Sequence, residues 1–255
     1  MLITAIVLAG LVAMSIHGDT AYFGRIQAEA LGWHLWWPGM LVAVLCGLVG
    51  GLFSRLLIQS LRGGHDRFSL WRRTHPLRFA AGCGLAVAVI GLACGGSTFG
   101  SGYQTTQALL HGQHDGQGLG MLMRLVSTWL SLWSGVPGGV FAPSLAIGAE
   151  LGAEVAQWTG HSDSRVLIAL GMAGFLAATT QAPITAFIIV MEMLEGHALI
   201  LSLMACTMIA SAIARLLSPS MYHALAVLQQ SRLSPPTSTQ AEVAEGHNRR
   251  HEVPA

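Results

Sequence analysis

The chain has 255 residues, of which 53% are hydrophobic and 10% are charged, and its formal net charge is +1. Typical soluble domains carry about 25% charged residues, so this composition argues against a soluble protein. The near-neutral charge gives no overall field that would attract nucleic acid or an acidic partner, so no nucleic acid is expected to bind.

Long stretches of the chain contain no Asp, Glu, Lys or Arg at all. A helix needs about 20 mainly apolar residues to cross the hydrocarbon core of a bilayer, and several stretches reach that length. They predict a multi-pass integral membrane protein in contact with lipid, of the kind found in a bacterial inner membrane or a plasma membrane. The uncharged stretches are residues 79–110, 125–149, 166–191 and 196–214.

The first predicted element is an apolar helix over residues 2–16. It lacks a basic start and an obvious cleavage site, so it reads as a retained helix rather than a signal peptide. Tryptophans at Trp33, Trp36 and Trp37 suit the headgroup region of a membrane. A second apolar helix is predicted from Pro38 to near residue 53.

An arginine-rich segment follows at residues 55–78, where six arginines face the single acid Asp66. The positive-inside rule predicts that this loop is cytoplasmic. The alternative is a patch that binds nucleic acid or lipid headgroups, but the segment is short and lies between two membrane runs, which favours the loop.

The middle of the chain alternates between apolar helices and glycine-rich or polar connections. A third helix is predicted at 79–95, a glycine-rich connection at 95–103, a short helix at 104–110 and a polar loop at 111–120. The loop contains two histidines and an aspartate, but one loop rarely supplies a full metal shell.

The second half contains helices that are interrupted by proline and glycine. Apolar helices are predicted at 122–133, 141–158, 166–179, 184–194, 199–217 and 221–230, with breaks between them at 134–139, 181–183 and 218–220. The expected membrane domain is therefore residues 1–230. Residues 231–255 are rich in Pro, Ser, Thr, Glu and His, and they predict a disordered polar tail.

Repeated breaks at membrane depth are informative because lipid offers no partner for an unpaired backbone group. They are tolerated where they are buried in protein or line a cavity. Several breaks in one chain therefore point to a transport pathway, with binding at the ends of interrupted helices.

The break before Pro143 has the chemistry of an anion site. Gly138 and Gly139 allow the backbone to approach a ligand, and Pro143 suits the first turn of a helix. The amides of Val140 and Phe141 would then point at an anion from a helix N-terminus. A buried arginine would hold chloride too tightly for release. A simple Gly/Pro hinge is the alternative from spacing alone.

Several segments resemble the CLC family of chloride channels and chloride/proton antiporters. Gly139-Val140-Phe141-Ala142-Pro143 resembles the GxFxP motif of that family, and the likeness extends over SGVPGGVFAPSLAIGAELG at 134–152. Further segments resemble the family in the same order along the chain, up to about residue 228: GSGY at 100–103, APIT and VMEM within 182–193, and PSMY at 219–222.

The resemblance implies an all-α, polytopic fold with broken and re-entrant helices, which is one half of an inverted repeat. It implies that Val140 and Phe141, beside Gly139, donate backbone amides to a chloride ion and that the Tyr222 hydroxyl donates to the same ion. Read without the family, Tyr222 is equally an interfacial anchor. No cofactor is implied beyond the transported chloride.

Only the second half of the family pattern is present. The resemblance implies a serine segment and a gating glutamate segment in a first half, and neither is found here. Channel and antiporter therefore stay open as alternatives. We expect either a complementary N-terminal half on another polypeptide or a truncated sequence, and a homodimer formed through the first helix and residues 184–217.

The competing function is a non-transporting membrane scaffold or an inactive relic. An intramembrane enzyme is not expected, because Ser97, Ser101 and Ser134 have no partner histidine on a facing run.

Overall fold

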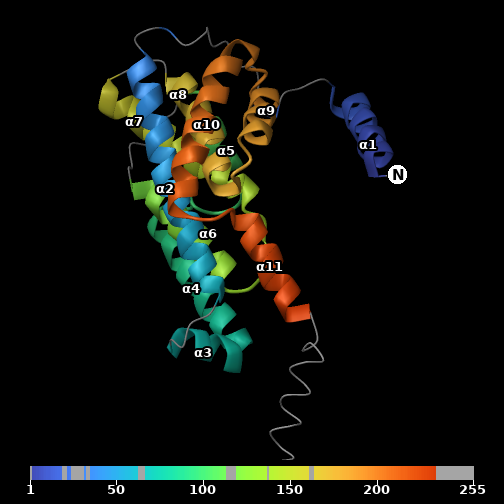
Figure 1. The fold of residues 1–255 in the computed structure, drawn as a ribbon, viewed down its shortest axis with the longest axis vertical. Helices are drawn as coiled ribbons and strands as arrows, with labels where there is room; N and C mark the ends of the chain where they lie inside the picture. The colour runs from blue at the N-terminus through green and yellow to red at the C-terminus, as the bar shows by residue number, and fades with distance from the viewer. Residues whose placement is uncertain are drawn as a thin grey trace, which may run out of the picture.

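The computed structural model describes residues 2–18, 22–23, 32, 35–62, 67–112, 119–136, 138–160 and 164–233. Within these ranges every regular element is helical, and most of the helices form one elongated bundle (Figure 1). The elements are α1 Leu2–His17, α2 Trp36–Arg62, α3 Arg67–Thr74, α4 Pro76–Ala93, α5 Tyr103–Leu110, α6 Leu119–Trp133, α7 Phe141–Thr159, α8 Ser164–Thr180, α9 Pro183–Leu194, the 3-10 turn η2 His197–Leu199, α10 Ile200–Leu217 and α11 Met221–Leu233.

The arginine-rich segment is largely helical, so the prediction of a loop over residues 55–78 is wrong. α2 continues to Arg62, well past its predicted end near residue 53, and α3 and the start of α4 occupy most of the remainder. Arginine is a good helix former, and nothing between 54 and 62 breaks a helix. Arg55 is exposed, but Leu57 and Ile58 after it are buried, so the packed face of α2 also continues past residue 53.

α8 is the central helix of the bundle. Its side chains are buried without interruption from Val166 to Thr179, and α2, α7, α9 and α10 pack around it. A helix that is apolar on all sides is stable only when protein or lipid covers every face.

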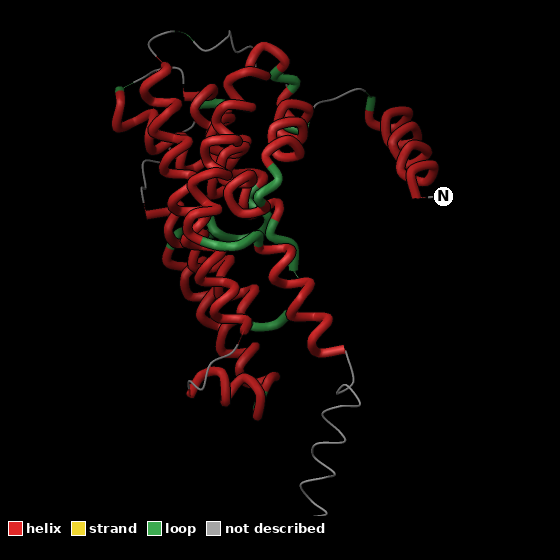
Figure 2. The backbone as a smooth tube through the Cα atoms, viewed as in Figure 1, coloured by secondary structure: helices red, strands yellow, loops and turns green. Residues whose placement is uncertain are grey.

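Among the described residues, three segments are long and apolar enough to cross a membrane: Trp36–Arg62, Pro76–Ala93 and His197–Leu217. Several other helices are shorter, and the 12 residues of α9 span only about 18 Å against a hydrocarbon core of about 30 Å. Figure 2 shows loop segments that interrupt the bundle near the middle of its length. The predicted pattern of broken helices is therefore confirmed.

α1 lies apart from the bundle (Figure 1). Its described side chains are exposed along its length although the helix is almost wholly apolar. An apolar helix with no buried face is compatible with lipid or with a partner chain, but not with water. Tyr22 and Phe23 do contact the bundle: Phe23 donates its amide to Met193 O at 3.1 Å, and the Tyr103 hydroxyl donates to Tyr22 O at 3.1 Å.

α11 extends to Leu233 and so includes the first three residues of the predicted polar tail. The remainder of that tail, residues 234–255, lies outside the described residues.

Candidate anion-binding site

The N-terminus of α7 lies at the break that the sequence marks as an anion site. Val140 is the N-cap, and its carbonyl accepts both the Ser144 amide at 3.0 Å and the Ser144 hydroxyl at 2.7 Å. These bonds close the first turn of the helix, which begins at Phe141, two residues after Gly139.

The first amides of α7 lack a protein partner among the described residues. Most helices place Ser, Thr, Asp or Asn at the N-cap so that a side chain accepts from the first turn. Here the N-cap is Val140, no side-chain cap is formed, and the first turn contains no acid. The amides of Val140 and Phe141 donate to no other described group. These donors are thus available to an anion.

The space beside the preceding glycine is open. A Cβ added at Gly139 would meet nothing within 4 Å, although Val140 next to it is only 6% exposed. The backbone at this point therefore borders a free volume on one side and the packed bundle on the other. A small ion could approach the Val140 amide from the side of Gly139.

Helices α7 and α8 pack in close backbone contact along their length. A Cβ at Gly148 or Gly152 would collide with the backbone of α8 at Gly171 and Leu167, respectively. Residue numbers rise along α7 as they fall along α8, so the two helices are antiparallel. This register places the start of α7 beside the last turn of α8, near Thr180.

A buried arginine holds the glycine-rich connection against α7. Arg124 on α6 donates from Nε to Glu150 Oε1 at 2.8 Å, and from Nη2 to Ser97 O at 2.6 Å and Thr105 Oγ1 at 3.0 Å. A Cβ at Gly102, which has φ +83°, would collide with Ala146 on α7. One guanidinium therefore ties α5, α6, α7 and the turn before α5 together.

The break after α8 is joined to the break before α11. Gln181 has φ +56°, and its Nε2 donates to Ser218 O at 2.7 Å. The Ser220 hydroxyl donates to Thr180 O at 3.3 Å, and Arg215 Nη2 donates to Gln181 O at 3.4 Å. The start of α11 is thus anchored at the same end of α8 as the start of α7.

Tyr222 lies in the first turn of α11 and is 49% exposed. α11 packs mainly against α2 and α8. Gly139, Val140 and Phe141 lie together at the start of α7. Tyr222 is related to them only indirectly, because the starts of α7 and α11 both lie at the end of α8.

Sequence reasoning did not identify the residues that support this site. Arg124 and Glu150 carried a detectable signal, because a charge inside an apolar membrane helix requires a partner. Gln181 and Ser218 carried no such signal in the sequence, because polar side chains are common in the loops between helices.

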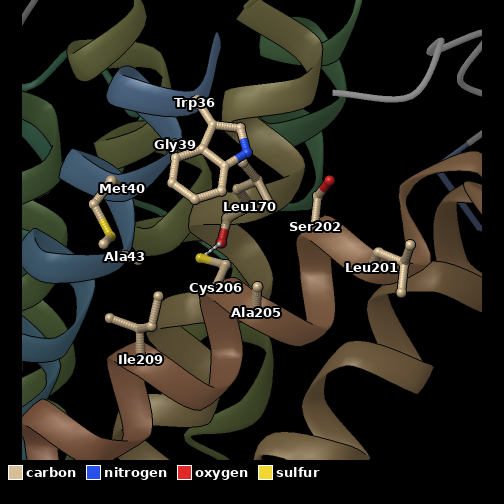
Figure 3. A pocket seen from close by; sticks show the side chains of 10 residues that line it. All are labelled: Trp36, Gly39, Met40, Ala43, Leu170, Leu201, Ser202, Ala205, Cys206 and Ile209. Atoms are coloured by element: carbon tan, nitrogen blue, oxygen red, sulfur yellow. Dashed lines mark hydrogen bonds between the residues drawn. The ribbon is translucent and has the colours of Figure 1, made fainter. Parts of the chain in front are cut away.

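A cavity of about 310 Å³ lies elsewhere, between α2 and α10 over α8, and it is lined mainly by apolar side chains (Figure 3). Trp36 and Leu201 lie near it, and Cys206 donates to Leu170 O at 3.4 Å in its wall. None of the predicted site residues lines this cavity, so it is separate from the α7 N-terminus.

Residues 1–215 match the family model described as "Voltage gated chloride channel". The match includes Gly139, Val140 and Phe141 and ends before Tyr222.

Curated relatives carry related names. The chain is 32% identical over 183 residues to the "Voltage-gated ClC-type chloride channel ClcB" of Salmonella typhi. The aligned region covers 68% of this chain and 43% of that protein. It is 28% identical over 233 residues to the "H(+)/Cl(-) exchange transporter ClcA" of Cronobacter sakazakii, covering 84% of this chain and 47% of the relative. The chain thus spans slightly less than half the length of these relatives.

Solved structures show the same fold. A CLC-type fluoride/proton antiporter matches 76% of this chain with a TM-score of 0.64 at 23% identity, and 47% of that antiporter is covered. A slow cyanobacterial Cl⁻/H⁺ antiporter matches 75% of this chain with a TM-score of 0.57 at 20% identity, with 48% of it covered. The polytopic, broken-helix fold predicted from the sequence is confirmed.

Proposed function

Because the chain belongs to the CLC family of voltage-gated chloride channels and is an integral membrane protein, we propose that it carries the second half of a chloride pathway. Chloride is held at the start of α7, beside Gly139, by the backbone amides of Val140 and Phe141. The observation that carries this proposal is the absence of any side-chain cap on these amides in the described chain.

The electrostatics of this position suit an ion that must also leave. The N-terminus of a helix carries about half a positive elementary charge, spread over its free amides. Conduction requires binding that is strong enough for entry and weak enough for release. The charged side chain of Arg124 is already engaged by Glu150, so the amides supply the attraction without a full cation at the ion.

Tyr222 completes the proposed site as a neutral hydroxyl donor. Its helix is anchored to the last turn of α8, which also borders the start of α7. A phenol donor adds no charge of its own, which keeps the binding weak.

The proposed transport is either passive or coupled to protons, because one relative is named a chloride channel and another an H⁺/Cl⁻ exchange transporter. A complementary half supplies the remaining ligands of the ion. Liposome assays that record chloride and pH together distinguish the two forms of transport.

We also propose a homodimer that buries α1 and the outer faces of α9 and α10. These faces expose large apolar side chains, including Ile184, Leu201 and Met208. In the dimer these apolar faces pack against each other, whereas in a monomer lipid covers them.

The function is tested on the native protein, purified from source membranes with its accompanying polypeptides and reconstituted in chloride-loaded liposomes. Gly139→Leu fills the open space beside the Val140 amide and should abolish chloride efflux. Gly84→Leu is the matched control, because its Cβ also meets nothing within 4 Å but lies on α4, away from the site. Absence of efflux from the unmodified protein would support the non-transporting scaffold instead.

A further inference from the structure

A cluster of basic and apolar side chains lies where α2 ends and α4 begins. We call Arg62, Arg72 and Arg78 the basic corner. Arg62 and Arg78 are exposed, while Arg72 is half-buried. Figure 1 shows α3 at this end of the bundle, below α2 and α4.

Helix α3 is fixed to both of its neighbours. Arg72 Nη1 donates to Ser60 O at 3.3 Å in the last turns of α2. The ring of Trp71 packs edge-on against Phe79 of α4, with centroids 5.4 Å apart. The arginines at the end of α2 and at the start of α4 are therefore held within one region of the surface.

A chain of aromatic rings marks the depth of this corner in the membrane. Phe79 packs edge-on against Trp133 at 5.0 Å, and Trp133 stacks on Trp129 at 5.0 Å. The indole of Trp129 donates to Ser60 Oγ at 3.1 Å. Tryptophans concentrate at the level of the lipid headgroups because one end of the ring is apolar and the other is polar.

Large apolar side chains are exposed at the same place. Leu77 is 86% exposed, Leu70 is 64% exposed and Trp71 is 42% exposed. Apolar side chains beside cations on a short surface helix are typical of segments that lie in a membrane interface. They distinguish this corner from a site for a soluble polyanion.

Arg62 and Arg78 of the basic corner have no acidic partner among the described residues. Described residues 35–62 and 67–112 contain no Asp or Glu. Guanidinium groups bind phosphate in a bidentate, charge-assisted geometry, so a phosphate group suits both arginines.

We propose that the basic corner binds the phosphate of an anionic phospholipid, with Arg62 and Arg78 at the headgroup and with Leu70, Trp71 and Leu77 among the acyl chains. The exposed leucines favour a lipid over nucleic acid or an acidic protein. This lipid site lies on the outer surface of the bundle and does not depend on chloride binding.

The test is native mass spectrometry of the detergent-purified native protein, incubated with equal amounts of phosphatidylglycerol and phosphatidylcholine. We expect phosphatidylglycerol to be retained preferentially. Arg62→Gln and Arg78→Gln should each lower its affinity about fivefold, the effect expected of one arginine near an anionic membrane surface. Arg165→Gln is the matched control, an exposed arginine at the start of α8, and it should leave retention unchanged.

Three results would overturn the proposal. Equal retention of both lipids would exclude charge recognition, and an equal loss in Arg165→Gln would show a general charge effect. The third result concerns the source of the phosphate. The double variant Leu70→Gln/Leu77→Gln should also weaken phosphatidylglycerol binding. If its binding is unchanged and inorganic phosphate competes fully, the site binds a soluble anion and the proposal fails.

Discussion

The guanidinium of Arg124 and the carboxylate of Glu150 form a buried ion pair, with Nε and Oε1 2.8 Å apart, that joins α6 to α7 across 26 residues of chain. The pair lies two to three turns into α7, so it sets the position of the helix whose N-terminus forms the proposed chloride site.

Arg124→Leu should strongly destabilise the fold, because it leaves Glu150 charged and buried without its partner. Breaking a buried ion pair on one side typically costs about 3–5 kcal/mol of unfolding free energy. The double variant Arg124→Leu/Glu150→Leu should recover much of this loss. Thermal unfolding in detergent measures both, and a double variant as unstable as the single one would show that the bonds to Ser97 and Thr105 dominate.

Gly148→Ala should destabilise the contact between α7 and α8, since the added methyl group would collide with the backbone of Gly171. Overpacking of this kind typically costs about 1–3 kcal/mol. Gly84→Ala is the matched control, because it adds the same methyl group to an open helix surface. Equal unfolding temperatures for the two variants would mean that the helices separate easily.

Tyr222→Phe should weaken chloride binding without changing stability, because the ring is half exposed and only the hydroxyl is removed. Hydrogen bonds to charged groups contribute about 1.5–3 kcal/mol, which corresponds to at least a tenfold change in the dissociation constant. Titration calorimetry of the native assembly with chloride measures this constant. Unchanged affinity would assign Tyr222 to the membrane interface instead.

Gln181→Gly should loosen the start of α11. Glycine adopts the φ of +56° readily, but the variant lacks the side chain that donates to the Ser218 carbonyl. Hydrogen exchange of the amides in residues 221–233 should become faster than in the unmodified protein. Gln104→Gly, at an exposed position of α5, serves as control, and equal exchange in both variants would show that Ser220 and the packing of Met221 suffice.

The sequence predicted the breaks of this fold well, because proline and glycine act locally. Pro143, Pro183 and Pro219 each lie within a few residues of a helix start in the structure. The prediction that α2 ends near residue 53 is wrong, because one exposed arginine at position 55 does not break a helix whose next apolar residues, Leu57 and Ile58, are buried.

The supporting contacts of the site could not be predicted, because they depend on how distant segments meet. Arg124 and Glu150 each indicate that a partner exists, but spacing alone does not pair them. The bond from Gln181 to Ser218 spans 37 residues and depends on the antiparallel path of α9 and α10.

The burial of α8 on every side also has a consequence for the order of synthesis. α10 follows α8 in the chain, so during translation the face of α8 that later packs against α10 is open to lipid. The side chains of α8 between Val166 and Ala178 are apolar, so this face is stable in contact with lipid until α10 is inserted. We therefore expect α8 to tolerate a delay in the arrival of α10, whereas α6 with Arg124 must remain near the insertion machinery until Glu150 has been made.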